Sequence, residues 1–428
     1  MRLLILLLPL YDVVIMSQTK ISIKSSGRKK IAVFIGGRSP EHDVSVVSGL
    51  QVYNAIDRSL YDPFIVYITT NGRWFIGDGL DKRENYIPKD LDNLSEVTLD
   101  ISGASTKGAL IPKESGLFSR PKPIEFDIAI PVFHGLYGED GNIQGMFEFA
   151  NIPYAGMRTK ASSVLMDKAT SKYVLQALDI PVLPFAKINR PADGGYLVPE
   201  EELDALLKPV GFPCILKPTH LGSSIGVAKA NDIKEAKACL PAIFEYDTSA
   251  IAEPFVPNLV EYNVSVGRIN GALKTSAIER PKSTDELLDF KQKYLSGSGK
   301  GGDKLGGAKQ ETSSSSEGML SLTREINPDI PKEMDANIRK WAVQMFEALD
   351  GAGAPRIDFI GDSQSGEIWM NEVNPLPGSF AYFLWEAAAE PVLFTDLMTS
   401  LIEEAFAQNR SMVIPSDPVP KDARLLKR

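Results

Sequence analysis

The chain has 428 residues, of which 43% are hydrophobic and 24% are charged, the composition of an ordinary globular protein. This length exceeds what one hydrophobic core usually supports, so it predicts two or three domains. The net charge of −9 and the pI of about 5.2 argue against nucleic acid as the main partner, because phosphate backbones are bound by basic surfaces. Two cysteines, Cys214 and Cys239, are too few for a disulfide framework or a zinc set and are expected to be reduced, buried thiols.

The N-terminus looks at first like a signal peptide, because the segment MRLLILLLPLYDVVIM has one basic residue and an apolar run. Pro9 and Asp12 interrupt the run, which is too short to span a bilayer and lacks a small-x-small cleavage site. Met16 opens MSQTK and is an alternative start. We therefore expect residues 1–27 to be a disordered leader or an overcalled start, with a lipid-inserted segment as the alternative. No other transmembrane run occurs in the sequence, and no membrane partner is expected.

A short buried strand is predicted for residues 29–35, KKIAVFI. Two glycines follow as a turn, and a helix is expected next, with Ser39 as its N-cap and Pro40 at its first position. The spacing does not match the G-x-G-x-x-G dinucleotide fingerprint, so a nicotinamide site is not favoured. Residues 61–69 and 126–132 are predicted as further strands.

These strands predict an open α/β domain over residues 28–156, with ligands held by the loops at the strand ends. One such loop is HGLYGEDGNIQG, residues 134–145, whose glycines permit tight turns and which carries His134 as a polar group at a strand's carboxyl end. For Glu139 and Asp140 we favour a structural role, in which both cap the next helix.

A second unit is expected over residues 157–250. Residues 158–178 are predicted as one helix with Lys168 in its middle. A strand follows at 214–217, and then a loop of small residues that contains Gly222, Ser223, Ser224 and Gly226. Backbone N–H groups and hydroxyls after a strand, beside the ammonium of Lys217, suit phosphate oxygens, although the loop is not a Walker A motif. A plain Ser/Gly hairpin turn is the alternative.

A third unit is expected over residues 251–415. At its start, AIAEPFVP (250–257) is predicted as a strand that ends in Glu253, and Glu261 begins another strand. Residues 296–318 are Gly, Ser and Lys with few apolar residues, which predicts a flexible segment that is either a linker or a lid over a site. Residues 331–349 repeat apolar positions at helical spacing and predict an amphipathic helix.

The densest set of functional groups follows that helix. Apolar alternation over residues 356–360 and 367–374, on either side of GDSQSG, predicts a β-hairpin. Alternate residues of a strand face the same side, so the faces that carry Arg356 with Asp358 and Glu372 with Asn374 should meet. Asp358, Glu372 and Asn374 are oxygen donors of the kind magnesium takes. A solvated hairpin face is the alternative.

Six motifs in this order resemble those of the ATP-grasp ligases and, within them, of the D-alanine–D-alanine ligase family: GGRSPEHDVSVVSG, HGLYGEDGNIQG, MDK, KPTHLGSSIGV, KYLS, and RIDF with NEVNPLPG. The resemblance extends from Lys30 to about Glu404. It implies an α/β ATP-grasp fold, with an N-terminal open α/β domain and two α+β subdomains that clamp ATP. It also implies a cytoplasmic enzyme of peptidoglycan-precursor synthesis and a homodimer.

The same resemblance implies roles for residues at matching positions. Lys168 and Lys217 match contacts to ATP phosphates, Glu253 and Glu261 match acidic residues at the adenine and ribose, and Lys293 precedes the loop over the nucleotide. The remaining matches lie at the amino acids and metal ions. Glu41 matches the residue that holds the first D-alanine's ammonium, with Ser223 and Tyr294 as its partners. Arg356 and the Gly378 N–H match the groups that stabilise the oxyanion. The matches to ligands of two magnesium or manganese ions are Asp358, Glu372 and Asn374.

Such an enzyme activates a carboxylate by phosphorylation, and the amine of a second amino acid then displaces phosphate. Both steps build charge on oxygen atoms, which cations in a closed site stabilise. The acceptor is the open point, because Phe383 stands where the family places a serine that binds the second substrate's carboxylate. Either Ser379 or a backbone N–H near Gly378 takes over that carboxylate, or Phe383 packs against a larger acceptor. D-serine, D-lactate or another amino acid is therefore an alternative to D-alanine, and a non-catalytic nucleotide-binding module is the alternative of a different class.

Overall fold

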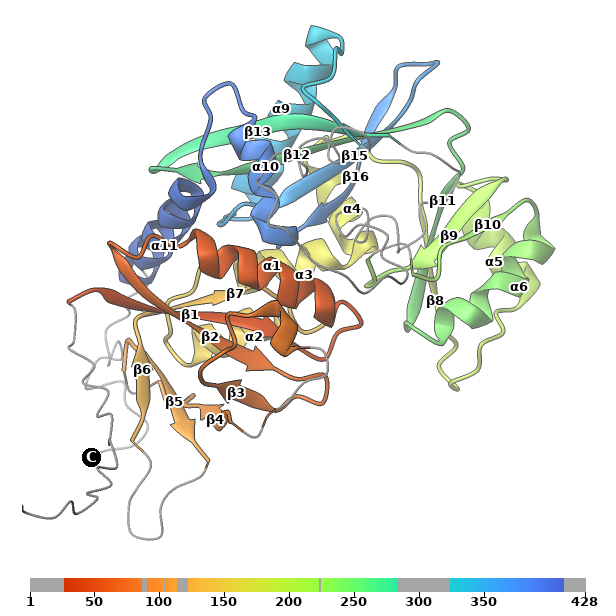
Figure 1. The fold of residues 1–428 in the computed structure, drawn as a ribbon. Coiled ribbons are helices and arrows are strands. Elements are labelled where there is room, and N and C mark those ends of the chain that lie inside the picture. The colour runs from red at the N-terminus through yellow and green to blue at the C-terminus, as the bar shows by residue number, and fades with distance from the viewer. Residues whose placement is uncertain are drawn as a thin grey trace, which may run out of the picture.

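The computed structural model describes residues 27–86, 91, 93–103, 105–113, 122–222, 225–282 and 324–411. The predictions for the leader up to residue 26, for the segment 296–318, and for Ser223, Lys293 and Tyr294 lie outside these ranges. The described strands form three sheets, of seven, four and five strands, which follow one another along the chain (Figure 1).

The first sheet has the strand order β6-β5-β4-β3-β2-β1-β7, and β1 runs parallel to β2 and β7. Its elements are β1 (Lys29–Gly36), α1 (His42–Ala55), β2 (Tyr61–Ile68), β3 (Trp74–Ile76), η1 (Arg83–Asn85), β4 (Ser95–Leu99), β5 (Gly108–Pro112), β6 (Ile124–Phe126), β7 (Ile128–Pro131) and α2 (Asn142–Phe149). Helix α1 packs on one face of β1 and α2 on the other, because side chains of a strand alternate between two cores.

Two sequence predictions in this domain were wrong in detail. The first helix begins at His42, with Glu41 rather than Ser39 at its N-cap, because residues 40 and 41 form a turn in which the Ser39 hydroxyl accepts from the Glu41 N–H at 3.1 Å. The run predicted as one strand over 126–132 is divided at Asp127 into β6 and β7. The Asp127 side chain accepts a hydrogen bond from the Lys30 N–H at 2.9 Å, so the residue between β6 and β7 is held to β1.

The middle sheet has the order β10-β9-β11-β8, and helices α5 and α6 share one core with it. Its elements are β8 (Ala186–Asn189), α5 (Glu200–Leu207), β9 (Cys214–Pro218), β10 (Ala228–Ala230), α6 (Ile233–Phe244) and β11 (Ser249–Pro254). The helix predicted over 158–178 is instead two helices, α3 (Thr159–Met166) and α4 (Lys168–Ala177). Asp167 divides them, because its carboxylate caps α4 by accepting from Ala169 N and Thr170 N. Lys168 is therefore the first residue of α4.

The third sheet has the order β14-β13-β12-β15-β16. Its elements are β12 (Leu259–Ile269), β13 (Ala272–Pro281), β14 (Arg324–Ile326), α9 (Lys332–Ala348), β15 (Arg356–Asp362) and β16 (Ile368–Asn374), followed by η2 (Gly378–Ala381), α10 (Tyr382–Glu386) and α11 (Phe394–Ser411). Helices α3, α4 and α9 pack on the apolar face of this sheet, which carries Val264, Ile357 and Phe359. The alternate residues, including Asp358, therefore face the opposite side.

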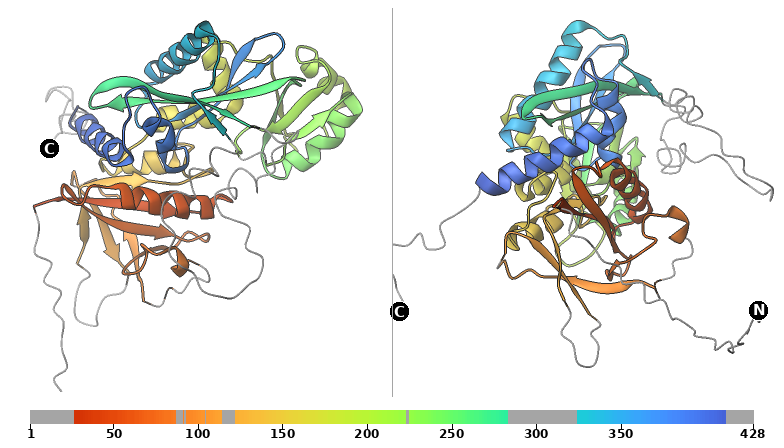
Figure 2. Two further views of the ribbon diagram at one scale, coloured as in Figure 1. Left: turned by 45° about the horizontal axis from the view of Figure 1, so that its top comes forward. Right: turned by 60° about the vertical axis from the view of Figure 1, so that its left-hand side comes forward.

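Helix α11 returns the chain to the first domain. Its residues Leu397, Leu401 and Ile402 are buried in the same core as Ile31 and Val33 of β1. In Figure 2 this blue helix lies beside the red helix α1 in both views. The first and third domains are thus held together by a shared apolar core.

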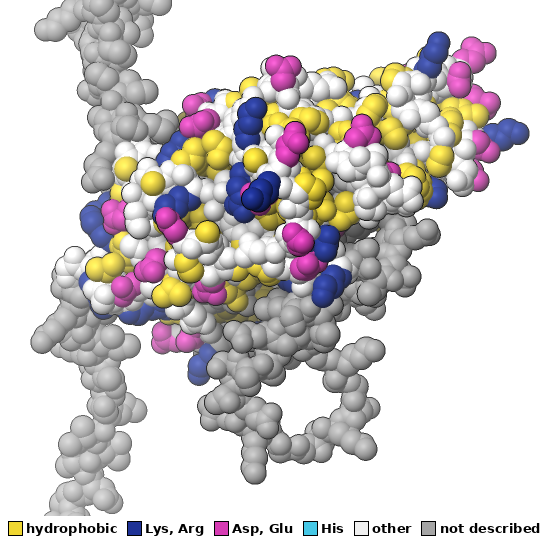
Figure 3. Space-filling model, turned by 90° about the horizontal axis from the view of Figure 1, so that it is seen from above, with side chains coloured by type: hydrophobic (Ala, Val, Ile, Leu, Met, Phe, Trp, Pro, Cys, Tyr) yellow, Lys and Arg dark blue, Asp and Glu magenta, His cyan; other side chains and the backbone are white. Residues whose placement is uncertain are grey.

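The outer face seen from above carries interspersed acidic, basic and apolar side chains (Figure 3). This face shows no continuous basic patch among the described residues. In the described part of the chain, no helix combines the length and apolar character needed to cross a membrane.

Candidate active site

The predicted hairpin is confirmed as β15 and β16. Asp358 stands opposite Glu372 in the register, and Arg356 stands opposite Asn374, so the four side chains share one face of the sheet. The Arg356 guanidinium donates to Asp358 through Nε at 2.6 Å and Nη2 at 2.7 Å. This bidentate pair fixes the arginine's orientation on the hairpin.

Lys168 connects three parts of the site. Its ammonium donates to the Leu221 carbonyl at 2.5 Å and lies 3.7 Å from Glu372 Oε2. Leu221 precedes Gly222 in the predicted phosphate loop, so the start of α4, the loop and β16 converge on one cation. The structure thus brings together three features that are far apart in the sequence.

A buried group of three charges lies beside this point. The Glu253 carboxylate is 2.6 Å from Lys172 Nζ through Oε1 and 2.6 Å from Lys217 Nζ through Oε2. Lys172 is fully buried and Glu253 is 3% exposed. Burial opposes ionisation of Glu253, but the two ammonium groups outweigh it and lower the pKa of Glu253 to about 2.

Lys172 was not among the site residues predicted from the sequence. It lies four residues after Lys168 on α4, and residues at this spacing share a helix face. The helix predicted over 158–178 already gives this spacing, so the spacing could have identified Lys172. Lys217 also donates to Asn371 Oδ1 at 3.3 Å, which links the group to β16.

The first domain contributes Glu41, which is buried at the start of α1. Gly135 approaches it so closely that a Cβ at this position would collide with the Glu41 carboxylate, and its φ of +70° also favours glycine. A Cβ on Gly222 would lie 3.9 Å from Glu41 Oε1. Glu41 therefore lies between the glycine-rich loop of the first domain and the phosphate loop of the second.

The prediction that Glu139 caps the next helix was wrong. Its buried carboxylate accepts from Gly135 N at 2.6 Å and, across the domain boundary, from Leu376 N at 3.3 Å. Burial, reinforced by the nearby Glu41 carboxylate, raises the pKa of Glu139 to about 8. With a pKa of about 8, Glu139 is mostly neutral at pH 7. Asp140 lies one residue before Gly141, the N-cap of α2, and its carboxylate accepts from Asn142 N, the first residue of α2, at 3.1 Å.

His134 lies next to the turn that follows β16. Its Nε2 is 3.1 Å from the Ser48 hydroxyl, and burial lowers the pKa of His134 to about 4, so the ring is neutral at pH 7. A Cβ on Gly378 would lie 3.6 Å from that same hydroxyl. Ser379 is buried and its hydroxyl donates to Gln51 of α1. Ser379 would have to give up this bond to bind a substrate.

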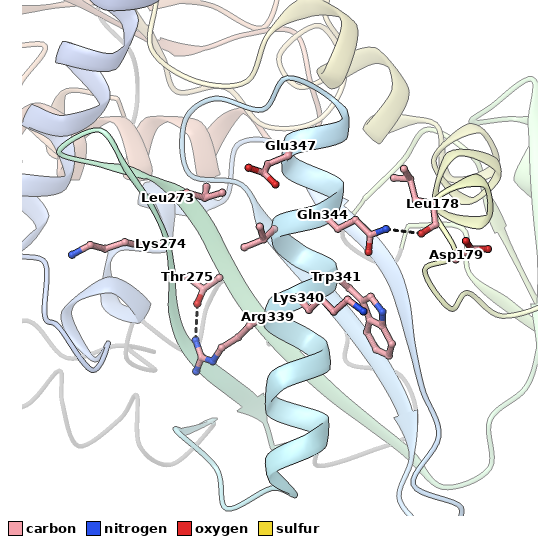
Figure 4. Close-up of a pocket in the computed structure, with 11 residues that line it drawn as sticks. Leu178, Asp179, Leu273, Lys274, Thr275, Arg339, Lys340, Trp341, Gln344 and Glu347 are labelled. Atoms are coloured by element: carbon pink, nitrogen blue, oxygen red, sulfur yellow. Dashed lines mark hydrogen bonds between the residues drawn. The ribbon is translucent and has the colours of Figure 1, made fainter.

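The described part of the structure contains two hollows. One of about 730 Å³ lies between α9 and β13 (Figure 4). Several of its polar groups are engaged within the protein, since Arg339 donates to Thr275 Oγ1 at 2.9 Å and Gln344 donates to the Leu178 carbonyl at 2.7 Å. This hollow lies on the apolar face of the third sheet, which is the other face from the one that carries Asp358. A hollow of about 360 Å³ lies in the first domain, lined by Gly37, Trp74, Phe133 and His134 among others.

His220 in the phosphate loop forms a further charged link. Its Nδ1 lies 2.9 Å from Asp247 Oδ1 and its Nε2 lies 3.2 Å from Asp167 Oδ2. Asp167 caps α4 and also pairs with Lys187 at 3.2 Å. The hydrogen bonds to Asp167 and Asp247 raise the pKa of His220 to about 9.

This shift predicts a pH-dependent contribution to stability. Because the pKa of His220 is about 9 in the fold and 6.5 without it, the charged ring stabilises the protein fully below pH 6.5, and this stabilisation is lost as pH rises through 9. We expect His220→Gln to lower the Tm at pH 6 by roughly 1–3 °C, since solvent screens the partly exposed pairs. Thermal unfolding from about pH 6 to 9.5 measures this effect, and an equal Tm difference across the range would contradict it.

The fold and the site together define the class of protein. A sheet face with paired carboxylates and an arginine, approached by lysines from α4 and from the second sheet and by a glutamate from an open α/β domain, is the arrangement of an ATP-grasp enzyme. The sequence model described as D-ala D-ala ligase N-terminus matches residues 30–157, and the one described as D-ala D-ala ligase C-terminus matches residues 174–403. The chain belongs to the D-alanine–D-alanine ligase family.

Individual relatives agree with this assignment. A D-alanine–D-alanine ligase of Heliobacterium modesticaldum is 31% identical over 396 residues, which cover 90% of this chain and 96% of the relative. One of Ruminiclostridium cellulolyticum is 32% identical, over 89% of this chain and 96% of the relative. Among solved structures, the VanG D-Ala:D-Ser ligase of Enterococcus faecalis has a TM-score of 0.69 and 26% identity, covering 88% of this chain and 99% of that one.

Proposed function

We propose that this chain is an ATP-dependent ligase that joins two amino acids, with D-alanine as the donor and D-alanine as the first candidate acceptor. The observation that carries the proposal is the convergence of Lys168, Glu372 and the phosphate loop on one face of the third sheet, with Arg356 and Asp358 beside them. The names of the relatives support the same reaction. The N-terminal domain supplies Glu41 for the donor.

The charged side chains of the site suit each step of this reaction. The donor's carboxylate attacks the γ-phosphorus of ATP, giving an acyl phosphate and ADP. Lys168 and Lys217 stabilise the negative charge on the transferred phosphate. The amine of the acceptor then attacks the acyl carbon, and inorganic phosphate leaves as the amide forms. Arg356 stabilises the oxyanion of that tetrahedral intermediate, and Glu41 orients the donor's ammonium without reacting.

The donor set on the hairpin fits magnesium or manganese. The proposed ligands are two carboxylates, Asp358 and Glu372, and the carboxamide of Asn374. Within the described residues, no group of three or more His, Cys, Asp or Glu side chains is placed to hold a metal ion, and this set contains only two such side chains. Hard oxygen donors of this kind bind magnesium when phosphate and water complete its shell. The metal would neutralise phosphate charge in both steps.

The test is amino-acid-dependent turnover of the purified chain with ATP and magnesium. We expect D-alanine to release one phosphate per dipeptide formed, and ¹⁸O in the donor's carboxylate to appear in the released phosphate. A panel of D-serine, D-lactate and bulkier D-amino acids, each offered with D-alanine, identifies the acceptor. Phosphate release that no amino acid stimulates would contradict the proposal and favour a nucleotide-binding module.

The family also implies a homodimer. Light scattering of the purified chain at several concentrations tests this, and a molar mass equal to that of one chain throughout would contradict it.

A further inference from the structure

The polar face of the third sheet continues beyond the hairpin. Asn263 on β12 stands opposite Asp358 in the register, and Glu279 on β13 stands opposite Asn263. Both are buried, at 7% and 3% exposure. In one orientation the Asn263 amide nitrogen lies 3.5 Å from Glu279 Oε2, and in the other it donates to Asp358 Oδ1 at 3.2 Å. A row of polar side chains therefore crosses β16, β15, β12 and β13.

Arg324 on β14 ends this row. It pairs with Pro281 in the register, two residues beyond Glu279, so its side chain is on the same face as Glu279. Its Nη1 lies 3.1 Å from Glu279 Oε1. Its guanidinium carbon lies 4.6 Å from the centre of the Phe383 ring on α10. The acid and the ring thus hold the guanidinium from two directions.

This guanidinium keeps donors to offer. An arginine has five N–H groups, and one contact to Glu279 cannot use them all. Among the described residues, the buried Nε of Arg324 has no hydrogen-bond partner. The side chain as a whole is 23% exposed.

The proposed reaction needs a partner for the acceptor's carboxylate, and Phe383 stands where the family resemblance places the serine that binds it. The acceptor keeps its carboxylate in the product, and a carboxylate in a closed site requires a charged or hydrogen-bonding partner. Lys168 and Lys217 lie at the opposite end of the row, and Arg356, which pairs with Asp358 on β15, is already assigned to the oxyanion. The ring of Phe383 cannot donate a hydrogen bond.

We propose that Arg324 binds the carboxylate of the acceptor, with Phe383 as the surface on which the guanidinium stacks and Glu279 as the group that fixes its orientation. This inference rests on the proposed ligase function. It assigns the acceptor to compounds with a free α-carboxylate, and it places the selecting residue on β14, outside the hairpin and the phosphate loop.

The test compares two acceptors in one reaction. Wild type and Arg324→Gln receive ATP, magnesium, D-alanine and D-alaninamide, and mass spectrometry gives the ratio of dipeptide to dipeptide amide. The amide lacks a carboxylate, so it can act only as an acceptor. We expect Arg324→Gln to lower this ratio roughly 10- to 100-fold, because a charged hydrogen bond to the carboxylate is lost. Arg324→Lys keeps the charge and should give an intermediate ratio.

The control is Arg280→Gln. Arg280 is adjacent to Glu279, so it points to the opposite face of the same two strands, where it pairs with Glu325. The Arg280→Gln variant should therefore leave the ratio of dipeptide to dipeptide amide unchanged. The transfer of ¹⁸O from D-alanine to phosphate reports the first step, which Arg324→Gln should leave within about threefold of wild type if it acts on the acceptor alone.

The outcomes separate the two proposals. A ratio in folded Arg324→Gln that equals the wild-type ratio overturns the role of Arg324 and leaves the ligase function standing. A wild type that makes neither product from any amino acid overturns the ligase function, and the role of Arg324 falls with it.

Discussion

Replacing Glu372 with Gln, or Asp358 with Asn, is expected to lower kcat by a factor on the order of 10³ while the protein stays folded. Each change keeps the size of the side chain and removes one negative charge from a partly exposed position on the hairpin face. Without that charge the set of oxygen donors binds a divalent cation weakly, and the phosphate charge of both steps is left unbalanced. Steady-state rates over a magnesium titration, with circular dichroism for folding, measure the effect.

Asp362→Asn is the matched control for these variants. Asp362 ends the same strand β15, but its carboxylate accepts from the turn N–H groups of Gln364 at 2.7 Å and Ser365 at 3.1 Å. An asparagine keeps an acceptor oxygen there, so kcat should be unchanged. If Glu372→Gln or Asp358→Asn kept near wild-type kcat at ordinary magnesium, the hairpin would not be the metal site.

The parts of the site that the sequence predicted are those set by local pattern. The alternation over β15 and β16 placed Asp358 and Glu372 on one face, and the register places them directly opposite each other. The helix predicted over 331–349 is α9, which begins one residue later because Pro331 is its N-cap. In these segments the local pattern and the tertiary structure agree.

The parts that were missed depend on contacts between distant segments. The apolar period runs through Asp167 without a break, so it does not show that a new helix starts there. Whether Glu139 is buried depends on Leu376, 237 residues further along the chain. The row from Asn263 to Glu279 requires β13, which the sequence analysis did not predict. The dipeptide Asn270-Gly271 was a sequence signal for a hairpin at this point. These two residues form the turn between β12 and β13, with φ values of +51° and +79°.

Stability should depend most strongly on the carboxylate between the two lysines. We expect Glu253→Gln to lower the free energy of unfolding by about 3–5 kcal/mol, because it leaves the ammonium groups of Lys172 and Lys217 close together without the charge that balances them. Nucleotide binding should weaken as well, since Lys217 loses the partner that holds it. Denaturant unfolding and ATP titration of the full chain measure the two effects.

The double variant Lys172→Met with Glu253→Gln distinguishes charge imbalance from loss of packing. It removes the fully buried ammonium together with its partner, so it should be more stable than Glu253→Gln alone. The effect also has a defined pH range. The pKa of Glu253 is about 2 in the fold and 4.5 without it, so its stabilisation is present above pH 4.5 and is lost as pH falls through 2. The difference between wild type and Glu253→Gln should therefore shrink on acidification below pH 4.5. A double variant no more stable than Glu253→Gln, or a stability difference that does not change with pH, would mean that the loss comes from packing rather than from unbalanced charge.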